Sequence, residues 1–164
     1  RDAMQGIHEF IPTELKAEYI NKLLQVGFDT IDFGSFVSPK AIPQMSDTKE
    51  VLKQLDLSGT RSKLLAIIAN LRGAEEAVAF NEITYLGFPF SVSETFQQRN
   101  TNSSIAESFE TVQKIQSLCN ANKKELVWQG VGSGVLTLDR DKKQERINEF
   151  VSEIMKQFPP QKKK

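Results

Sequence analysis

The chain has 164 residues with 21 basic and 21 acidic side chains, so its formal net charge is zero. This length favours one domain with one core, and the even charge balance argues against a nucleic-acid-binding protein, which normally has a clustered positive face. No stretch is apolar enough to span a membrane, no signal peptide is recognisable, and one cysteine cannot form an intramolecular disulfide. We therefore expect a cytoplasmic protein with no nucleic-acid and no membrane partner.

The spacing of apolar residues predicts alternating helices and strands in the first half of the chain. Residues 13–26 show helical spacing. The apolar side of this helix carries Leu15, Tyr19, Leu23 and Val26. Residues 30–37 are expected to form a short strand, and residues 46–57 a second helix capped by Ser46. The continuous apolar run at residues 63–69 is typical of a parallel strand covered on both sides.

The alternation continues in the second half. We expect a helix over 71–80, a strand over 82–90, a helix opened by a capping box at residues 104–107, a strand within 126–138 and a final helix over 142–158. This order favours βαβ units in a parallel sheet. A TIM barrel, a flavodoxin-like open sheet and a fragment of either stay open. The visible strands are too few for a complete barrel of eight, and the pattern begins as if a strand ending at Arg1 preceded it.

Charged residues fall at the expected carboxyl ends of the strands, where parallel α/β proteins collect their functional groups. Arg1 can stabilise a developing enolate or oxyanion through its fixed charge. Asp2 can bind Mg²⁺ or Mn²⁺, which prefer carboxylate oxygens. Asp32 can hold Arg1 through a bidentate ion pair. The residues alone leave a plain surface ion pair equally open.

Several longer segments occur in order and at matching spacings. They are Arg1-Asp2-Ala3-Met4-Gln5, Ser35-Phe36-Val37-Ser38-Pro39-Lys40, Pro43-Gln44-Met45, Asn70-Leu71-Arg72-Gly73 and Ser103-Ser104-Ile105-Ala106-Glu107-Ser108. Together, from residue 1 to about residue 126, they resemble the hydroxymethylglutaryl-CoA lyase family of metal-dependent TIM-barrel lyases. The resemblance implies a partial TIM barrel, or its rearrangement as an open parallel sheet with flanking helices. It also implies cleavage of 3-hydroxy-3-methylglutaryl-CoA to acetyl-CoA and acetoacetate, a step of leucine degradation, with Mg²⁺ or Mn²⁺.

The resemblance also implies roles by position. Arg1 would polarise the substrate carbonyl and steady the enolate, Asp32 would stand behind the arginine, and Asp2 would be a metal ligand. The residues implied near the acyl-CoA substrate are Gln5, Ser35, Asn100 and Ser104. Because a partial barrel exposes sheet edges and an apolar interior, we expect a homo-oligomer.

The departures from the family pattern limit this reading. Asp32 replaces a longer glutamate, and His8 is the only histidine, whereas the family's metal site uses a His-x-His segment and its chemistry a cysteine in a Gly-rich loop. The match is lost after about residue 126, so residues 1–126 are expected to form the lyase-like partial barrel and residues 127–164 a divergent strand-turn-helix tail packing on the same domain. An impaired lyase and a non-catalytic half-barrel both stay open. The ordered segments disfavour an unrelated module that binds a phosphorylated ligand at Gly130, Gly132 and Gly134.

Overall fold

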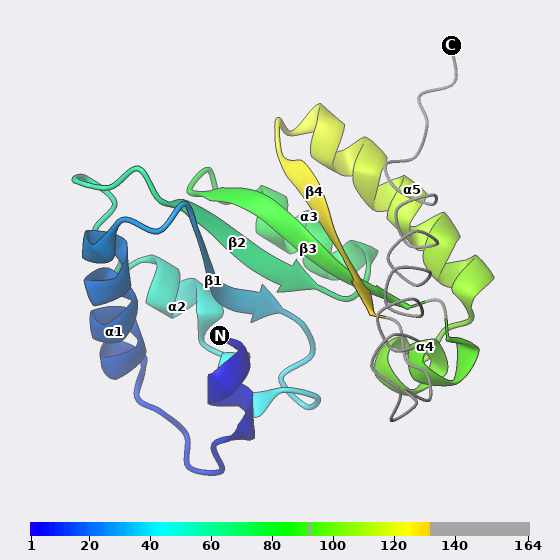
Figure 1. Cartoon of the computed structure of the whole chain (residues 1–164), viewed down its shortest axis with the longest axis horizontal. Coiled ribbons are helices and arrows are strands. Elements are labelled where there is room, and N and C mark those ends of the chain that lie inside the picture. The colour runs from blue at the N-terminus through cyan, green and yellow to red at the C-terminus, as the bar shows by residue number, and fades with distance from the viewer. Residues whose placement is uncertain (92, 132–164) are drawn as a thin grey trace, which may run out of the picture.

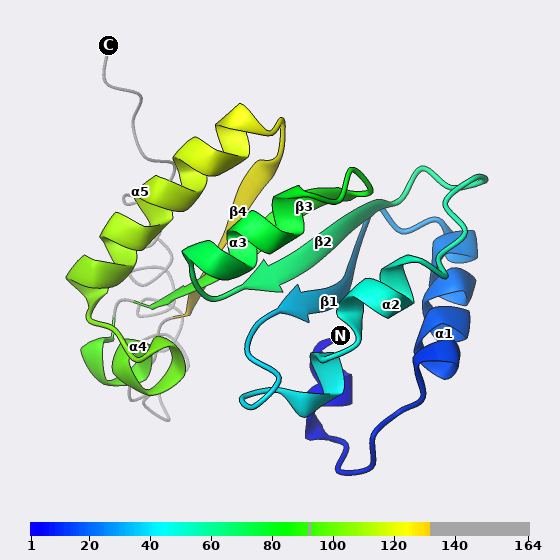
Figure 2. The same ribbon diagram turned by 180° about the vertical axis from the view of Figure 1, so that it is seen from behind.

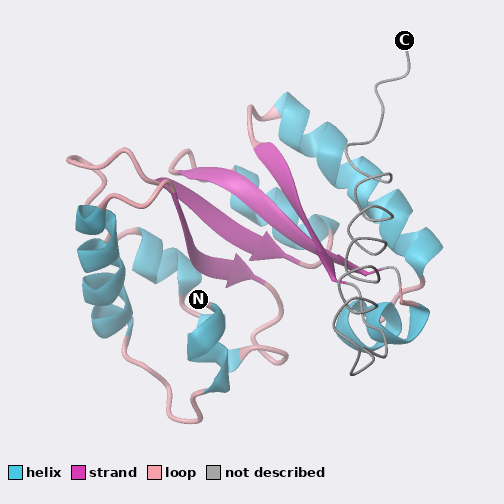
Figure 3. Ribbon diagram, in the orientation of Figure 1, coloured by secondary structure: helices cyan, strands magenta, loops and turns pink. Residues whose placement is uncertain are grey.

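Helices and strands alternate along the chain in the computed structural model, which describes residues 1–91 and 93–131 (Figure 3). The elements are, in order, the 3₁₀ turn η1 (Asp2–Gly6), α1 (Thr13–Val26), β1 (Thr30–Phe36), the 3₁₀ turn η2 (Pro43–Met45), α2 (Thr48–Leu52), β2 (Lys63–Ile68), α3 (Leu71–Val78), β3 (Ile83–Ser91), α4 (Glu94–Thr101), α5 (Ile105–Ala121) and β4 (Glu125–Val131). The rest of the strand expected within 126–138, the helix expected over 142–158 and most of the Gly-rich turn lie outside the described residues.

The four described strands form one parallel sheet in the order β1-β2-β3-β4 (Figure 1). Each strand is joined to the next by a helical crossover. Since right-handed crossovers that always step in the same direction put their helices on one face, this order is that of a barrel segment. A doubly wound sheet would reverse its strand order. The expected α/β partial barrel is confirmed.

The core lies between the sheet and the helices on this face. α3 lies behind the strands in Figure 1 and in front of them in Figure 2. The most deeply buried side chains come from the two central strands and from α3 and α5: Leu64, Ala66, Ile68, Ala74, Ala77, Ile83, Leu86, Phe88, Ile115 and Cys119. Burial of each large apolar side chain contributes about 1.5–3 kcal/mol. The helix-covered face of the sheet therefore holds the fold together.

α1 has the predicted limits, but its apolar side is largely exposed. Leu15, Tyr19 and Val26 are 54%, 52% and 66% exposed, respectively. The residues that α1 buries are Lys16, Ala17, Ile20 and Leu24. The helix turns Lys16 inward because polar groups of the segment around η2 bind its ammonium group.

α2 is shorter than predicted, and its cap differs from the expected Ser46. The helix covers only Thr48–Leu52 and begins after Asp47, whose side chain makes no capping hydrogen bond. The Asp47 carboxylate instead accepts from Lys16 Nζ at 2.7 Å and from Thr13 Oγ1 at 2.8 Å. By contrast, the capping box of α5 forms as predicted, with Ser104 and Glu107 bonded to each other's backbone nitrogen. Within the described part of the chain, no helix has the length and apolarity needed to cross a membrane.

The Asn70–Gly73 segment brings α3 very close to β1, and this closeness explains its glycine. A Cβ on Gly73 would lie 2.2 Å from the backbone oxygen of Phe36. We expect Gly73→Ala to lower the free energy of unfolding by about 1–3 kcal/mol, because the backbone of β1 cannot move aside without cost. Urea unfolding measures this. Gly59→Ala is the matched control, since its Cβ meets no atom within 4 Å; equal losses in both variants would contradict the prediction.

Candidate active site

A β-bulge in β1 places two predicted site residues on the same face of the sheet. Asp32 and Ser35 are three positions apart and would face opposite sides of a regular strand. The register shifts between Asp32 and Gly34, so Asp32 pairs with Leu65 and Ser35 with Ile67. Leu65 and Ile67 share a face, because a Cβ on Gly87 would touch both side chains. We call this side, opposite the helices, the inner face.

α2 holds the bulge in place. Thr48 Oγ1 accepts a hydrogen bond from the backbone nitrogen of Ser35 at 3.2 Å and donates to the Met45 carbonyl at 2.9 Å. A Cβ on Gly34 would lie only 2.6 Å from Thr48 Cγ2. Glycine at this position therefore lets α2 approach the strand at the point where the register changes.

Arg1 and Asp32 form an ion pair on the inner face, at the third residue of β1. Arg1 Nε lies 2.9 Å from each carboxylate oxygen of Asp32, and the backbone nitrogen of Arg1 donates to the Asp32 carbonyl at 3.1 Å. The pair is not the expected two-nitrogen fork, because one nitrogen serves both oxygens. Arg1 Nη1 is 3.5 Å from Asp2 Oδ1. The Arg1 side chain is only 11% exposed, so its charge is largely shielded from water.

Burial and the charge of Arg1 act in opposite directions on the pKa of the Asp32 carboxyl group. Burial raises its pKa above the usual value, and the neighbouring Arg1 guanidinium offsets only part of this rise. A carboxyl group with a raised folded-state pKa contributes most to stability below its unfolded-state pKa. That contribution is lost as pH rises through the folded-state pKa. The Arg1 guanidinium thus favours the ionised form of Asp32 against the effect of burial on its pKa.

Two of the predicted substrate-binding residues have buried polar atoms without a partner. Gln5 Nε2 and Ser35 Oγ make no hydrogen bond to any residue that the structure describes. A buried donor or acceptor left unpaired costs about 1–3 kcal/mol, and such a group calls for an explanation in an otherwise satisfied fold. A bound ligand that hydrogen bonds to these atoms would remove this cost.

The other two predicted substrate-binding residues lie elsewhere. Asn100 is exposed on α4, and its Nδ2 donates to the Phe96 carbonyl at 2.8 Å. Ser104 caps α5. In Figures 1 and 2, α4 lies on the β3–β4 side of the sheet, away from the N-terminus. The structure therefore brings Arg1, Asp2 and Asp32 together, but leaves Asn100 and Ser104 in local helix contacts.

The described residues do not form a complete site for a divalent cation. The Asp2 side chain is 87% exposed and offers one carboxylate, while Asp32 is occupied by Arg1. No group of three or more His, Cys, Asp or Glu side chains suited to a metal occurs within residues 1–91 and 93–131. Magnesium demands near-ideal octahedral geometry and is usually bound through one or two carboxylates together with substrate groups and water. Asp2 fits one such ligand position and no more.

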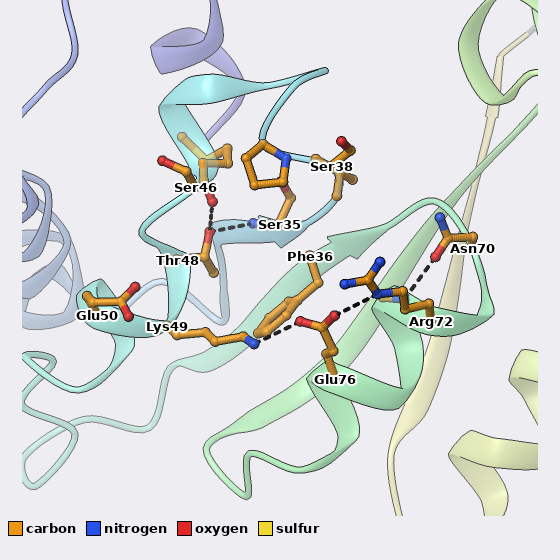
Figure 4. Close-up of a pocket in the computed structure, with 14 residues that line it drawn as sticks. Ser35, Phe36, Ser38, Ser46, Thr48, Lys49, Glu50, Asn70, Arg72 and Glu76 are labelled. Atoms are coloured by element: carbon orange, nitrogen blue, oxygen red, sulfur yellow. Dashed lines mark hydrogen bonds and ion pairs between the residues drawn. The ribbon is translucent and has the colours of Figure 1, made fainter.

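A cavity of about 430 Å³, lined in part by Ser35, opens between the β1–α2 connection and α3 (Figure 4). The carboxylate of Glu76 on α3 forms ion pairs with Lys49 at 2.8 Å and with Arg72 at 3.3 Å. Because Glu50 adds a second acid to the lining, these charges balance and select no particular ligand charge. The sequence analysis gave these residues no role; the four-residue spacing of Arg72 and Glu76 was the available signal.

The comparisons with known proteins point to one class, the carbon–carbon lyases. The cytoplasmic 3-hydroxy-3-methylglutaryl-CoA lyase of Homo sapiens is 41% identical over 120 residues, which is 70% of this chain and 31% of the relative. The mitochondrial hydroxymethylglutaryl-CoA lyase of Mus musculus is 40% identical over 113 residues, covering 67% of this chain and 33% of the relative. The names thus include both a cytoplasmic and a mitochondrial protein.

The solved structures agree with the sequence relatives. An HMG-CoA lyase from Acinetobacter baumannii, in complex with coenzyme A and 3-methylmalate, matches 94% of this chain and 51% of its own, with a TM-score of 0.75 and 28% identity. The HMG-CoA lyase of Brucella melitensis matches 94% of this chain and 55% of its own, with a TM-score of 0.75 and 26% identity. The predicted resemblance to part of a hydroxymethylglutaryl-CoA lyase is confirmed. The chain spans about a third of the length of these curated relatives and about half of the matched structures.

A family model described as a domain of unknown function, DUF4136, matches residues 82–160. This match overlaps the second half of the described sheet and assigns no activity. The sequence relatives and the solved structures agree with each other on the lyases, so the lyase relation guides the interpretation of the site.

The ion pair between Arg1 and Asp32 makes a prediction about titration. Arg1→Gln removes the positive charge that lowers the pKa of Asp32, so we expect this pKa to rise further. A ¹³C NMR titration of the Asp32 carboxyl group measures the change. Arg61→Gln, at an exposed position, is the control and should leave the titration unchanged. An unchanged or lower Asp32 pKa in Arg1→Gln would show that the ion pair does not govern this carboxyl group.

Proposed function

We propose that this chain carries the arginine-bearing part of a hydroxymethylglutaryl-CoA lyase site, for cleavage of 3-hydroxy-3-methylglutaryl-CoA to acetyl-CoA and acetoacetate. The observation that supports this most is the shielded Arg1 guanidinium, held by Asp32 on the inner face. Gln5 of η1 and Ser35 of β1 add two buried polar atoms without partners among the described residues, Gln5 Nε2 and Ser35 Oγ. These groups can bind the oxygens of an acyl-CoA substrate.

The reaction requires stabilisation of negative charge at the thioester. As the 3-hydroxyl group loses its proton to a base, the C2–C3 bond breaks, C3 becomes the ketone of acetoacetate, and the electron pair passes into the thioester as an enolate. A fixed guanidinium aimed at the thioester oxygen, which carries the negative charge of the enolate, stabilises the enolate more than the substrate. Asp32 engages Arg1 through Nε, and Arg1 Nη1 lies 3.5 Å from Asp2 Oδ1, so Nη2 would face the substrate. Gln5 and Ser35 would orient the acyl group.

A divalent cation, Mg²⁺ or Mn²⁺, is part of the proposal only through Asp2. When bound, such a cation polarises substrate oxygens. Asp2 is the one candidate ligand that the described residues offer, so no step of the reaction is placed on the metal. We further propose, as the sequence suggests, that residues 1–126 form the lyase-like unit, that residues 127–164 form a divergent tail, and that the protein is cytoplasmic.

The alternative function is a non-catalytic half-barrel that serves as an interaction or structural protein. One observation favours it: His8 is the only histidine of the chain, whereas the lyase relation implies a His-x-His pair at the metal. Asn100 would then only hydrogen bond within α4 and Ser104 only cap α5, without any role in substrate binding.

Acetoacetate release separates these two functions. We expect the wild-type chain to release acetoacetate from 3-hydroxy-3-methylglutaryl-CoA with added Mg²⁺ or Mn²⁺, and Arg1→Gln to lower kcat by about 10²–10³-fold, because the enolate loses its fixed positive charge. The measurement is a coupled assay of acetoacetate, with Arg61→Gln as the control that should keep wild-type turnover. No turnover by well-folded wild-type protein would favour the non-catalytic half-barrel, and equal turnover in Arg1→Gln would remove Arg1 from the mechanism.

We also propose that the chain associates with a second copy through the apolar side of α1. Leu15, Tyr19 and Val26 are at least half exposed there, and Phe10 at 51% extends the patch. A patch of this kind marks an interaction surface, and a net charge of zero removes long-range repulsion between copies.

Sedimentation velocity tests this association. We expect wild-type protein to sediment as an oligomer and Tyr19→Lys to shift it toward monomer, because a charge on the patch would be buried without a partner. Phe109→Lys is the control, since Phe109 is 48% exposed on α5, apart from this patch. A monomeric wild type, or the same shift in both variants, would contradict the proposed surface.

A further inference from the structure

The side-chain amide of Gln44 forms hydrogen bonds to the backbone of residues 7–11, the segment that directly follows η1. Gln44 is 4% exposed and belongs to η2. Gln44 Nε2 donates to the carbonyls of Ile7, at 2.9 Å, and Glu9, and Gln44 Oε1 accepts from the backbone nitrogen of Ile11 at 3.2 Å. One amide thus binds three backbone groups of residues 7–11. We call this set of contacts the Gln44 clamp.

A buried lysine fixes the Gln44 clamp from the other side. Lys16 Nζ donates to the Gln44 carbonyl and, at 2.7 Å, to Asp47 Oδ1. The Lys16 ammonium group also lies 4.0 Å from the centre of the Phe10 ring. Removing one partner of a buried ion pair is strongly destabilising, so this arrangement gives η2 and the start of α1 a fixed relative position.

η1 needs such an anchor because apolar packing does not hold it. This short 3₁₀ turn carries Asp2 and Gln5 and contains no buried residue. One end is fixed by the contacts of Arg1 with Asp32. The other end runs directly into Ile7, the first residue bound by Gln44. The position of Arg1 is therefore set by polar contacts at both ends of the turn.

We propose that Gln44 is a positioning residue of the candidate active site. By binding residues 7–11, it holds η1 so that the Arg1 guanidinium stays on Asp32. The catalytic consequence rests on the proposed lyase function, whereas the effect on Arg1 does not. Gln44 belongs to the Pro43-Gln44-Met45 segment, to which the sequence alone gave no chemical role.

The experiment compares Gln44→Met, Gln44→Glu and the control Gln113→Met in the full chain. Methionine keeps the volume but loses all three bonds. Glutamate keeps the acceptor for Ile11 and places a carboxylate oxygen against the carbonyls of Ile7 and Glu9. Gln113 is exposed on α5. The readout is the ¹⁵N–¹H signal of Arg1 Nε, whose proton exchanges slowly with water only while the bond to Asp32 persists, together with the amide signals of β2 and β3.

We expect fast exchange of the Arg1 Nε proton in both Gln44 variants, with unchanged β2 and β3 signals and no change in Gln113→Met. If the wild type turns over substrate, kcat should fall by about 10²-fold in both Gln44 variants, as for a misplaced catalytic group. If it does not, the lyase function fails while the Arg1 signal still decides the role of Gln44. Unchanged Arg1 exchange in a folded Gln44 variant overturns the proposal. Loss of all native signals in both variants also overturns it, because Gln44 would then be a general stability residue.

Discussion

The register shift in β1 is the constraint on which the candidate site depends. Without the extra residue between Asp32 and Gly34, Ser35 would leave the inner face and Asp32 would stand there alone. α2 lies against the strand at this shift, with Thr48 close to Gly34 and hydrogen bonded to the backbone of Ser35. A contact on the helix-covered side of the sheet therefore accompanies the register that places these side chains on the opposite side.

Much of the fold could be predicted from sequence. The spacing of apolar residues indicates which side of a helix or strand is buried, and capping residues mark the ends of helices. The limits of α1 and the capping box at Ser104 were predicted closely. α4 was missed because its sequence, ETFQQRNT, has almost no apolar side to detect. α2 was predicted over 46–57 but covers only Thr48–Leu52, and Asp47 before it binds Thr13 and Lys16 from elsewhere in the chain instead of capping the helix. Long-range pairing of this kind leaves no periodic signal.

The site was predicted less completely than the fold. Sequence reasoning predicted that Arg1 meets Asp32 but expected this at the carboxyl end of the strand, whereas Asp32 is the third of the seven residues of β1. The geometry of this ion pair did not follow from the sequence, because a bulge and a shared Nε contact depend on three-dimensional packing. Asn100 and Ser104 matched by position alone, and the structure shows them in helix-end contacts. Gln44 was visible as part of a motif, but its partners lie more than thirty residues away.

The two faces of the sheet place opposite demands on this chain. The helix-covered face buries Leu64, Ala66 and Ile68 almost completely, whereas Leu65 and Ile67 on the inner face are only partly buried. Stability thus comes from one face and the candidate chemistry lies on the other. A fixed charge stabilises an enolate best where water is excluded, yet the Asp32 side chain is still 35% exposed. Covering the inner face would strengthen the attraction between Asp32 and Arg1 and the field at the substrate, but it would also raise the pKa of Asp32 through further burial. The proposed chemistry therefore requires a dry inner face on which Arg1 still offsets the burial of Asp32.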